Sequence, residues 1–201
     1  GQGDAAFIEL PDGRRLLVDG GSGGGPRFDV GERVVAPFLW NRAIYGLDVV
    51  AMSHSDPDHA GGLATVLRQF KVKEFWESGA RNGESAELLS IVQRRGVVRR
   101  ELRRGERVRL GPVLATILHP PGELLRGSPR GPASDENNNS LVLRLQWGAL
   151  SFLFTGDLEQ EGEASLLESS LPLQHLVLKV GHHGSRFSTT EQFLAASQPT
   201  V

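Results

Sequence analysis

The stretch MSHSDPDHAGG, residues 52–62, carries the greatest density of side chains that could bind a metal. Two histidines and two aspartates fall within six positions, His54, Asp56, Asp58 and His59. Imidazole nitrogens and carboxylate oxygens are donors that divalent metals bind in proteins, and a tight loop can offer them to two ions. The alternative, a polar helix start capped by Asp58, explains that aspartate but not the other three residues. The spacing therefore predicts a metal site.

Two shorter motifs follow apolar runs later in the chain. FTGD ends at Asp157, and GHHGS contains His182, His183 and Ser185. An aspartate between a strand and a helix is often only a helix cap, so Asp157 indicates a ligand only if it shares a sheet edge with the histidine loop. Of the two histidines, one is expected to bind a metal and the other to support a ligand or contact substrate. These residues alone leave open which is which.

Lysine is rare in this chain, which has 19 arginines and 3 lysines. Lys179 lies three residues before His182, near the end of an apolar run. A lysine that reaches into a metal site suits a phosphate partner, and Ser185 could bind phosphate oxygens beside it. The alternative is an edge-strand lysine whose ammonium group reaches solvent.

The elements that must position these residues are short strands and helices. Strands are predicted at residues 5–10, 15–20, 47–53, 72–78 and 174–181, in a hairpin over 140–157, and between Val97 and Leu118. Helices are predicted at residues 32–44, 62–70, 85–95, 159–170 and 188–196, the last with Ser188 as its N-cap. The polar stretch Pro120–Asn139 is predicted to be a long loop.

The polar motifs adjoin the ends of these predicted strands. They are Asp19, His54–His59, Asn137–Ser140, Asp157 and His182–Ser185. If the strand ends share one edge, five separate loops converge on one site.

Composition limits the classes of function. The chain has 201 residues, a formal net charge of −2 and no cysteine, which excludes disulfides, thiolate ligands and a cysteine nucleophile. It has no apolar run near the roughly 20 residues of a membrane-spanning helix. Eight arginines lie between Arg94 and Arg109; they predict either a phosphate-contacting strip or, as charged runs more often do, a face that only meets solvent. We expect one domain over residues 1–201, cut from a longer protein.

The motifs LLVDGG, SHSDPDHAGG, FTGD and LKVGHHGS, in this order, resemble the metallo-β-lactamase superfamily. More closely, GQGDA, NNNSLVL and LKVGHHGSRFST resemble the C-terminal hydrolase-like domain of the ComEC family, membrane channel proteins that import single-stranded DNA during natural competence. The resemblance covers essentially the whole chain. It implies an α+β fold, a four-layer αββα sandwich of mixed β-sheets with outer helices and a two-metal site.

The resemblance also assigns roles to residues. It implies that His54 and Asp56 serve one metal, Asp58 and His59 the other, that Asp157 bridges, and that His182 or His183 completes the second site. Matching GHHG to the final G-H-G of the superfamily favours His183. Asp19 is expected to support the ligands, and Asn137, Asn139, Lys179 and Ser185 to contact substrate.

Two departures from the superfamily pattern bear on the metal. Asp56 stands where the second histidine of the H-x-H-x-D-H triplet is usual, and NNNS stands where a mid-chain histidine is usual. His119 is the nearest histidine, but HPP after a strand indicates a structural turn. Oxygen donors in place of imidazole favour harder ions. We therefore expect two divalent ions, Mn²⁺ before Zn²⁺ or Mg²⁺.

These features favour a metal-dependent phosphodiesterase or nuclease that acts on DNA and degrades the strand that is not imported, with Asp58 and Lys179 as catalytic residues. The alternatives are a catalytically weak module that guides DNA, or a small-molecule metallohydrolase of the lactonase or glyoxalase type. The resemblance implies DNA and the membrane channel of the parent protein as partners. It also implies a monomeric, soluble domain of a bacterial inner-membrane protein, on the extracytoplasmic side, with no membrane insertion of its own.

Overall fold

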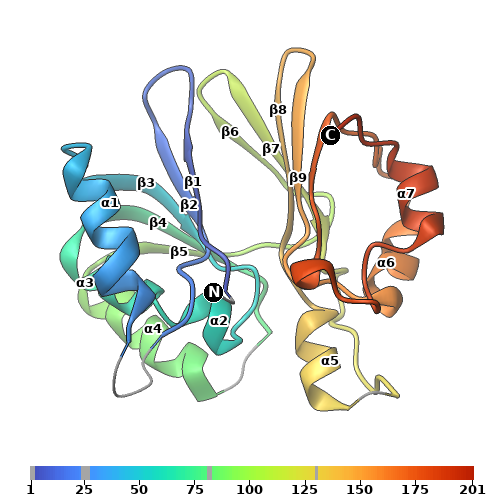
Figure 1. Ribbon diagram of the computed structural model, residues 1–201, viewed down its shortest axis with the longest axis horizontal. Helices are drawn as coiled ribbons and strands as arrows, with labels where there is room; N and C mark the ends of the chain where they lie inside the picture. The colour runs from blue at the N-terminus through green and yellow to red at the C-terminus, as the bar shows by residue number, and fades with distance from the viewer. Residues whose placement is uncertain (1–2, 24–27, 81–82, 130) are drawn as a thin grey trace. The chain divides into compact units, whose positions relative to one another are not determined.

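The computed structural model describes residues 3–23, 28–80, 83–129 and 131–201, so the first two residues of GQGDA lie outside the described part. The chain forms two compact units, residues 1–101 and 102–201, each built on a five-stranded sheet (Figure 1). No helix in the described ranges is both long enough and apolar enough to cross a lipid bilayer. The expectation of one domain over the whole chain stays a prediction.

The first unit places its strands in sequence order across the sheet. The strands are β1 (Ala6–Glu9), β2 (Arg15–Val18), β3 (Gly46–Ala51), β4 (Lys71–Glu77) and β5 (Val98–Glu101). β1 and β2 form the predicted antiparallel hairpin, and β2 to β5 run parallel to one another. The helical segments between them are η1 (Gly31–Val35), α1 (Ala36–Asn41), α2 (Pro57–Ala60), α3 (Leu63–Gln69) and α4 (Gly83–Arg94).

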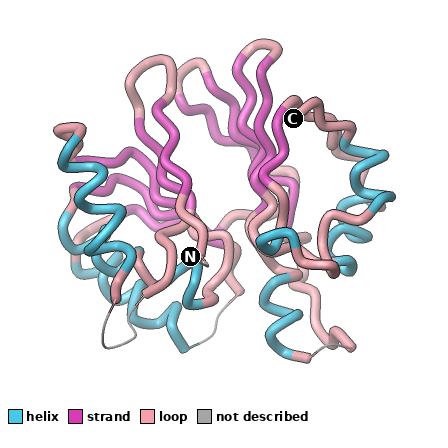
Figure 2. Tube along the Cα trace, viewed as in Figure 1, coloured by secondary structure: helices cyan, strands magenta, loops and turns pink. Residues whose placement is uncertain are grey.

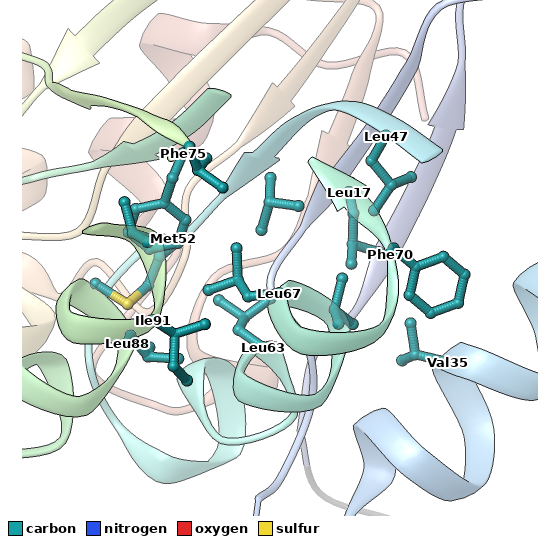
Figure 3. Packing of buried hydrophobic residues seen from close by; sticks show 14 of the residues in the cluster. Leu17, Val35, Leu47, Met52, Leu63, Leu67, Phe70, Phe75, Leu88 and Ile91 are labelled. Carbon is teal, nitrogen blue, oxygen red and sulfur yellow. The ribbon is translucent and has the colours of Figure 1, made fainter. Parts of the chain in front are cut away.

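A hydrophobic core holds the helices of this unit against its sheet. Parallel strands are buried on both faces and therefore read as continuous apolar runs, as LDVVAM does. Figure 3 shows Leu47 and Phe75 of the sheet and Leu63, Leu67 and Ile91 of the helices packed into one cluster. All five side chains are at most 2% exposed. This packing fixes where each strand ends, and so where the following loop begins.

The second unit is mostly antiparallel. Its strands are β6 (Arg107–Leu110), β7 (Val113–His119), β8 (Val142–Trp147), β9 (Leu150–Phe154) and β10 (Val177–Lys179), and the sheet order is β10-β9-β8-β7-β6. Only the β9–β10 pair is parallel. The helices are α5 (Pro132–Asn137), α6 (Gln160–Leu167), the short η2 (His182–Gly184) and α7 (Glu191–Ser197). Figure 2 shows helices and strands as separate layers within each unit.

Two local predictions are wrong. Pro120–Asn139 is not all loop, because α5 lies within it. Its glycine and proline mark the helix start rather than break it: Gly131 has φ +94°, and Pro132 occupies the first turn, where its fixed φ suits a helix. The cap of α7 is Thr190, whose hydroxyl accepts from the Phe193 backbone N–H at 3.2 Å. Ser188 instead donates to the carbonyl of Gly181.

Candidate metal centre

In the first unit, two polar motifs meet at one edge of the sheet. Asp19 follows β2 and Ser53–His54 follow β3. Because β2 and β3 are parallel, their carboxyl ends lie at the same edge, which is where open parallel sheets place their sites. The two motifs therefore share one edge within this unit, while the convergence of all five loops on one site stays a prediction.

Asp19 is the hub of this edge. Its Oδ1 accepts from the Ser53 backbone N–H at 2.7 Å, and its Oδ2 accepts from the Ser53 hydroxyl at 2.8 Å. Nδ1 of His59 lies 2.9 Å from Oδ2. Burial alone would raise the pKa of this carboxyl. The hydrogen bond and charge of His59 lower the pKa by more than burial raises it, so the pKa lies below its ordinary value. Asp19 thus remains charged and directs the lone pair of His59 to Nε2.

The two histidines of the loop are held side by side. Both side chains are fully buried, and their ring centroids lie 4.3 Å apart. His54 is anchored through Nδ1, 2.9 Å from the Ser53 hydroxyl. Its Nε2 lies 3.7 Å from Oδ2 of Asp56, whose side chain is 30% exposed. His54 and Asp56 thus present an imidazole nitrogen and a carboxylate oxygen to each other, as two ligands of one ion would.

The glycine pair after the loop permits a close approach of two backbones. A Cβ on Gly62 would lie 2.1 Å from the carbonyl oxygen of Gly20, and a Cβ on Gly61 would lie 2.0 Å from the nitrogen of Gly23. The backbone N–H of Gly20 donates to the carbonyl of His59 at 2.8 Å. Glycine at 61 and 62 therefore sets the distance between the histidine loop and the segment after Asp19.

Gly62→Ala is expected to lower the free energy of unfolding by at least about 2 kcal/mol, because the new methyl group must displace backbone rather than a flexible side chain. Urea denaturation measures the change. Gly122→Ala is the control, since a Cβ there meets no atom within 4 Å. Equal stability of the two variants would contradict this explanation of the glycine pair.

Asp4 is a candidate ligand that the sequence did not predict. A carboxylate oxygen of Asp4 lies within 4.8 Å of an imidazole nitrogen of His59. The Asp4 backbone N–H donates to the carbonyl of Asp58 at 3.0 Å, and its carbonyl accepts from Gly21. The only signal in the sequence is its place in GQGDA. Asp58 itself lies in α2, with its side chain in the first turn.

In the second unit, four polar segments share one sheet edge. β7 and β8 are antiparallel, as are β8 and β9, while β9 and β10 are parallel. The end of β7, the start of β8 and the ends of β9 and β10 therefore coincide. This places His119, Asn137–Ser140, Asp157 and His182–Ser185 at one edge. These segments therefore share one edge within this unit as well.

Asp157 and both histidines of GHHGS lie together. Oδ2 of Asp157 is 3.8 Å from Nε2 of His182 and 3.5 Å from Nε2 of His183. The carboxylate is buried, and both rings are partly exposed. The two histidines have left-handed backbones, with φ 45° and 51°, which turn both rings toward the same carboxylate. Which of them binds a metal stays open from these distances.

The three asparagines before β8 are buried. Nδ2 of Asn137 donates to Oε1 of Glu159 at 3.3 Å, and Oδ1 of Asn138 accepts from the Gly162 backbone at 2.9 Å. Asn139 bonds both backbone groups of Leu125. These bonds hold the loop before β8; substrate contact by Asn137 and Asn139 stays a prediction.

Lys179 is the last residue of β10 and is half-buried. Its carbonyl accepts from the Thr155 hydroxyl at 3.2 Å. Ser185 is also half-buried, and its hydroxyl accepts from the Phe187 backbone at 3.3 Å. Their predicted roles toward phosphate stay predictions.

Several arginines of the 94–109 run have partners within their own unit. Arg99 Nε donates to Oε1 of the buried Glu77 at 2.7 Å, and Arg100 pairs with Glu74 at 2.8 Å. Arg104 donates to the Leu118 carbonyl and to a serine hydroxyl. These pairings give the three arginines partners within the protein, and a phosphate-contacting role for the run stays a prediction.

His119 lies at the end of a strand, where the HPP motif predicted a structural turn. It is buried at the end of β7, and its Nδ1 lies 3.2 Å from the carbonyl of Ser140. Burial, partly offset by that contact, lowers the pKa of His119 to about 3. The ring is therefore neutral at physiological pH.

The free energy of unfolding of the metal-free chain should fall as the pH drops from about 6.5 toward 3. In that window the unfolded chain protonates His119 and the folded chain does not, so this group contributes up to about 1.4 kcal/mol per pH unit. Urea denaturation in EDTA at several pH values measures the slope. His119→Gln should flatten it; an unchanged slope would contradict the assignment.

Comparison with known proteins places this geometry in a family. A model of the metallo-beta-lactamase superfamily matches residues 1–201. The chain is 34% identical over 212 residues to ComE operon protein 3 of Bacillus subtilis, covering 99% of this chain and 26% of that protein. It is 30% identical over 206 residues to competence protein ComA of Neisseria gonorrhoeae, covering 99% of this chain and 25% of that protein. The chain thus spans about a quarter of the length of these relatives.

Among solved structures, the diiron β-hydroxylase CmlA from Streptomyces venezuelae has the same fold. Its TM-score is 0.56 at 14% identity, covering 99% of this chain and 44% of that one. The predicted metallo-β-lactamase fold, with mixed sheets and outer helices, and the predicted similarity to the ComEC family are both confirmed. Over its whole length, the chain belongs to the metallo-β-lactamase superfamily.

Proposed function

We propose that this chain is a divalent-metal-dependent phosphodiesterase that hydrolyses DNA. The observation that carries the proposal is the donor set itself: strand-end carboxylates and imidazoles, with an aspartate at position 56 and no thiolate in the chain. Metal-dependent hydrolysis is the chemistry of the superfamily. Oxygen-rich donors suit the hard ions that commonly serve phosphoryl chemistry.

The proposed ligands are those that the family motifs indicate. His54 and Asp56 serve one ion, Asp58 and His59 the other, Asp157 both, and His182 or His183 completes the second, as the order of the motifs implies. The residues fit such ions, because buried imidazoles are anchored through Nδ1 and so present Nε2. Asp4 adds a carboxylate beside His59, one of the proposed ligands of the second ion.

Bound ions would supply a water of lowered pKa and a positive field for the phosphate. The chain's own residues do the rest. Asp58 orients the attacking water, because its carboxylate accepts a hydrogen bond from the water O–H. The Lys179 ammonium and the Ser185 hydroxyl offset charge on the non-bridging oxygens, and Asn137 and Asn139 hold the substrate strand.

The relatives suggest where such an activity acts. They include proteins named for a com operon and for competence, of which this chain matches about a quarter. We propose that the domain degrades the DNA strand that is not imported, as part of a membrane channel protein and on its extracytoplasmic side.

A metal panel tests the function. The chain, stripped with EDTA, is reloaded with Mn²⁺, Mg²⁺ or Zn²⁺ and incubated with end-labelled single- and double-stranded DNA. We expect cleavage with Mn²⁺ above all, and none in EDTA. Intact DNA under every metal, with Asp58→Ala behaving identically, would contradict the proposal.

The second candidate is a module that guides DNA without cleaving it, and the missing imidazoles at one metal position favour it. Elemental analysis together with a salt titration of DNA binding separates the two. One ion or none per chain, with salt-sensitive binding and no cleavage, would favour guiding.

A further inference from the structure

Glu159 carries a buried carboxylate that the proposed function leaves unexplained. The residue is 4% exposed, although it lies only two positions after Asp157. The Ser134 hydroxyl and Nδ2 of Asn137 both donate to this carboxylate, the latter at 3.3 Å. A buried carboxylate is expensive to maintain unless hydrogen-bond donors or a positive partner compensate it.

Glu159 stands at the N-cap of α6, yet its side chain makes no capping hydrogen bond. The side chain of Asn138 caps this helix instead, because its Oδ1 accepts from the backbone N–H of Gly162 at 2.9 Å and from that of Glu159 at 3.2 Å. The Asn138 amide oxygen thus accepts from the free backbone N–H groups at the start of the helix. The Glu159 carboxylate is not needed for capping and can bind another group.

The carboxylate faces His182. Its Oε1 lies 3.2 Å from Nδ1 of His182, which is within ion-pair distance, and this buried Nδ1 has no hydrogen-bond partner among the described residues. The other nitrogen of the ring, Nε2, lies 3.8 Å from Oδ2 of Asp157. One ring therefore connects a buried carboxylate on one side with the proposed bridging carboxylate on the other. Metal-binding histidines typically hold their second nitrogen against a carboxylate in this way.

We propose that Glu159 is a positioning residue for His182. It holds the proton on Nδ1, turns the lone pair of Nε2 toward Asp157, and so makes His182 the imidazole ligand beside that aspartate. His183, whose Nε2 also lies near Asp157, is then left to contact substrate. The inference rests on the proposed metal function and deepens it by deciding between the two histidines.

Metal affinity tests the inference without reference to activity. Mn²⁺ binding to the 201-residue chain is measured by calorimetry for wild type, Glu159→Ala and Glu159→Gln. We expect Glu159→Ala to weaken binding by roughly 10- to 100-fold, and Glu159→Gln, which keeps an acceptor, to weaken it less. In the Co²⁺-loaded chain, the absorption bands of the ion should shift in Glu159→Ala.

Glu163→Gln is the matched control. Glu163 is a buried carboxylate on the same helix, and it accepts from the backbone and hydroxyl of Thr190 rather than from a histidine. This variant should lose stability without any change in Mn²⁺ affinity or Co²⁺ spectrum. If Glu159→Ala does not fold, Glu159→Gln carries the comparison.

A double-mutant cycle shows whether Glu159 acts through His182. In a His182→Ala background, Glu159→Ala should have almost no further effect on Mn²⁺ affinity. A full additional loss in that background, or wild-type affinity and spectrum in both Glu159 variants, would overturn the inference while the metal function stands. A wild-type chain that binds no metal would instead overturn the proposed function itself.

Discussion

Asp157→Asn is expected to lower kcat/KM for Mn²⁺-dependent DNA hydrolysis by at least about 10³-fold. Asparagine has nearly the same shape, but it is neutral and offers one carbonyl oxygen where the bridging role needs two anionic ones. The backbone N–H of residue 157 donates to the hydroxyl of Ser140 at 3.2 Å, which the substitution leaves in place. The loss would correspond to about 4 kcal/mol of transition-state stabilisation.

Initial rates on labelled DNA measure this effect, with thermal unfolding as a check that the variant is folded. Asp12→Asn is the control, because Asp12 lies in the β1–β2 turn and pairs with Arg14 at the surface. A variant that keeps more than a tenth of the wild-type rate would remove Asp157 from the proposed centre.

Asp19→Asn is expected to affect both stability and metal affinity. The backbone should tolerate the change, since φ at Asp19 is +62° and asparagine adopts this left-handed conformation readily. The side chain should not, because an amide cannot accept from Ser53 and face His59 with the same charge. We expect a loss of about 2–4 kcal/mol in the free energy of unfolding and a roughly 10- to 100-fold weaker Mn²⁺ affinity.

Urea denaturation of the metal-free chain and calorimetry with Mn²⁺ measure the two effects. Asp48→Asn provides the comparison within the same unit. Asp48 pairs with the exposed Lys73 and accepts from the Arg15 backbone N–H, which an asparagine carbonyl can also do, so the change in stability should be less than about 1 kcal/mol. If the two variants behave alike, Asp19 is not the anchor of the histidine loop.

Three of the residues that the sequence identified share one property: each follows an apolar strand. Asp19, His54 and Asp157 were recognisable because polar side chains at the ends of buried strands have few structural reasons to be there. Strand pairing then brings such residues to one edge, as β2 and β3 do. The apolar pattern along a single strand is local, so this part of the site was predictable.

The residues that the sequence missed take their meaning from contacts far along the chain. Glu159 occupies an ordinary helix-cap position, and only the Asn138 amide, 21 residues away, shows that its carboxylate is released from capping. Asp4 lies in an N-terminal segment, and its proximity to His59 arises from pairing with the backbone of Asp58. Neither contact has a short-range signature.

The predictions of the α7 cap and of the loop at residues 120–139 were wrong for a different reason. Ser188 and Thr190 both have hydroxyl groups before a helical pattern, and the choice between them depends on Glu163. Its carboxylate holds the Thr190 backbone N–H at 3.0 Å and so sets where α7 begins. The 120–139 segment has the glycine and proline content of a loop, although Gly131 and Pro132 mark the start of α5. Local propensity left both alternatives open, and tertiary contacts decided.

The most direct test of the central claim is hydrolysis of end-labelled DNA by the Mn²⁺-loaded chain, run beside Asp157→Asn purified in the same way. We predict new 5′- or 3′-phosphate ends that form with wild type and Mn²⁺, stop in EDTA, and are absent with the variant. Undiminished cleavage by the variant, or intact DNA with a wild-type chain shown to hold its metal, would contradict the proposed phosphodiesterase.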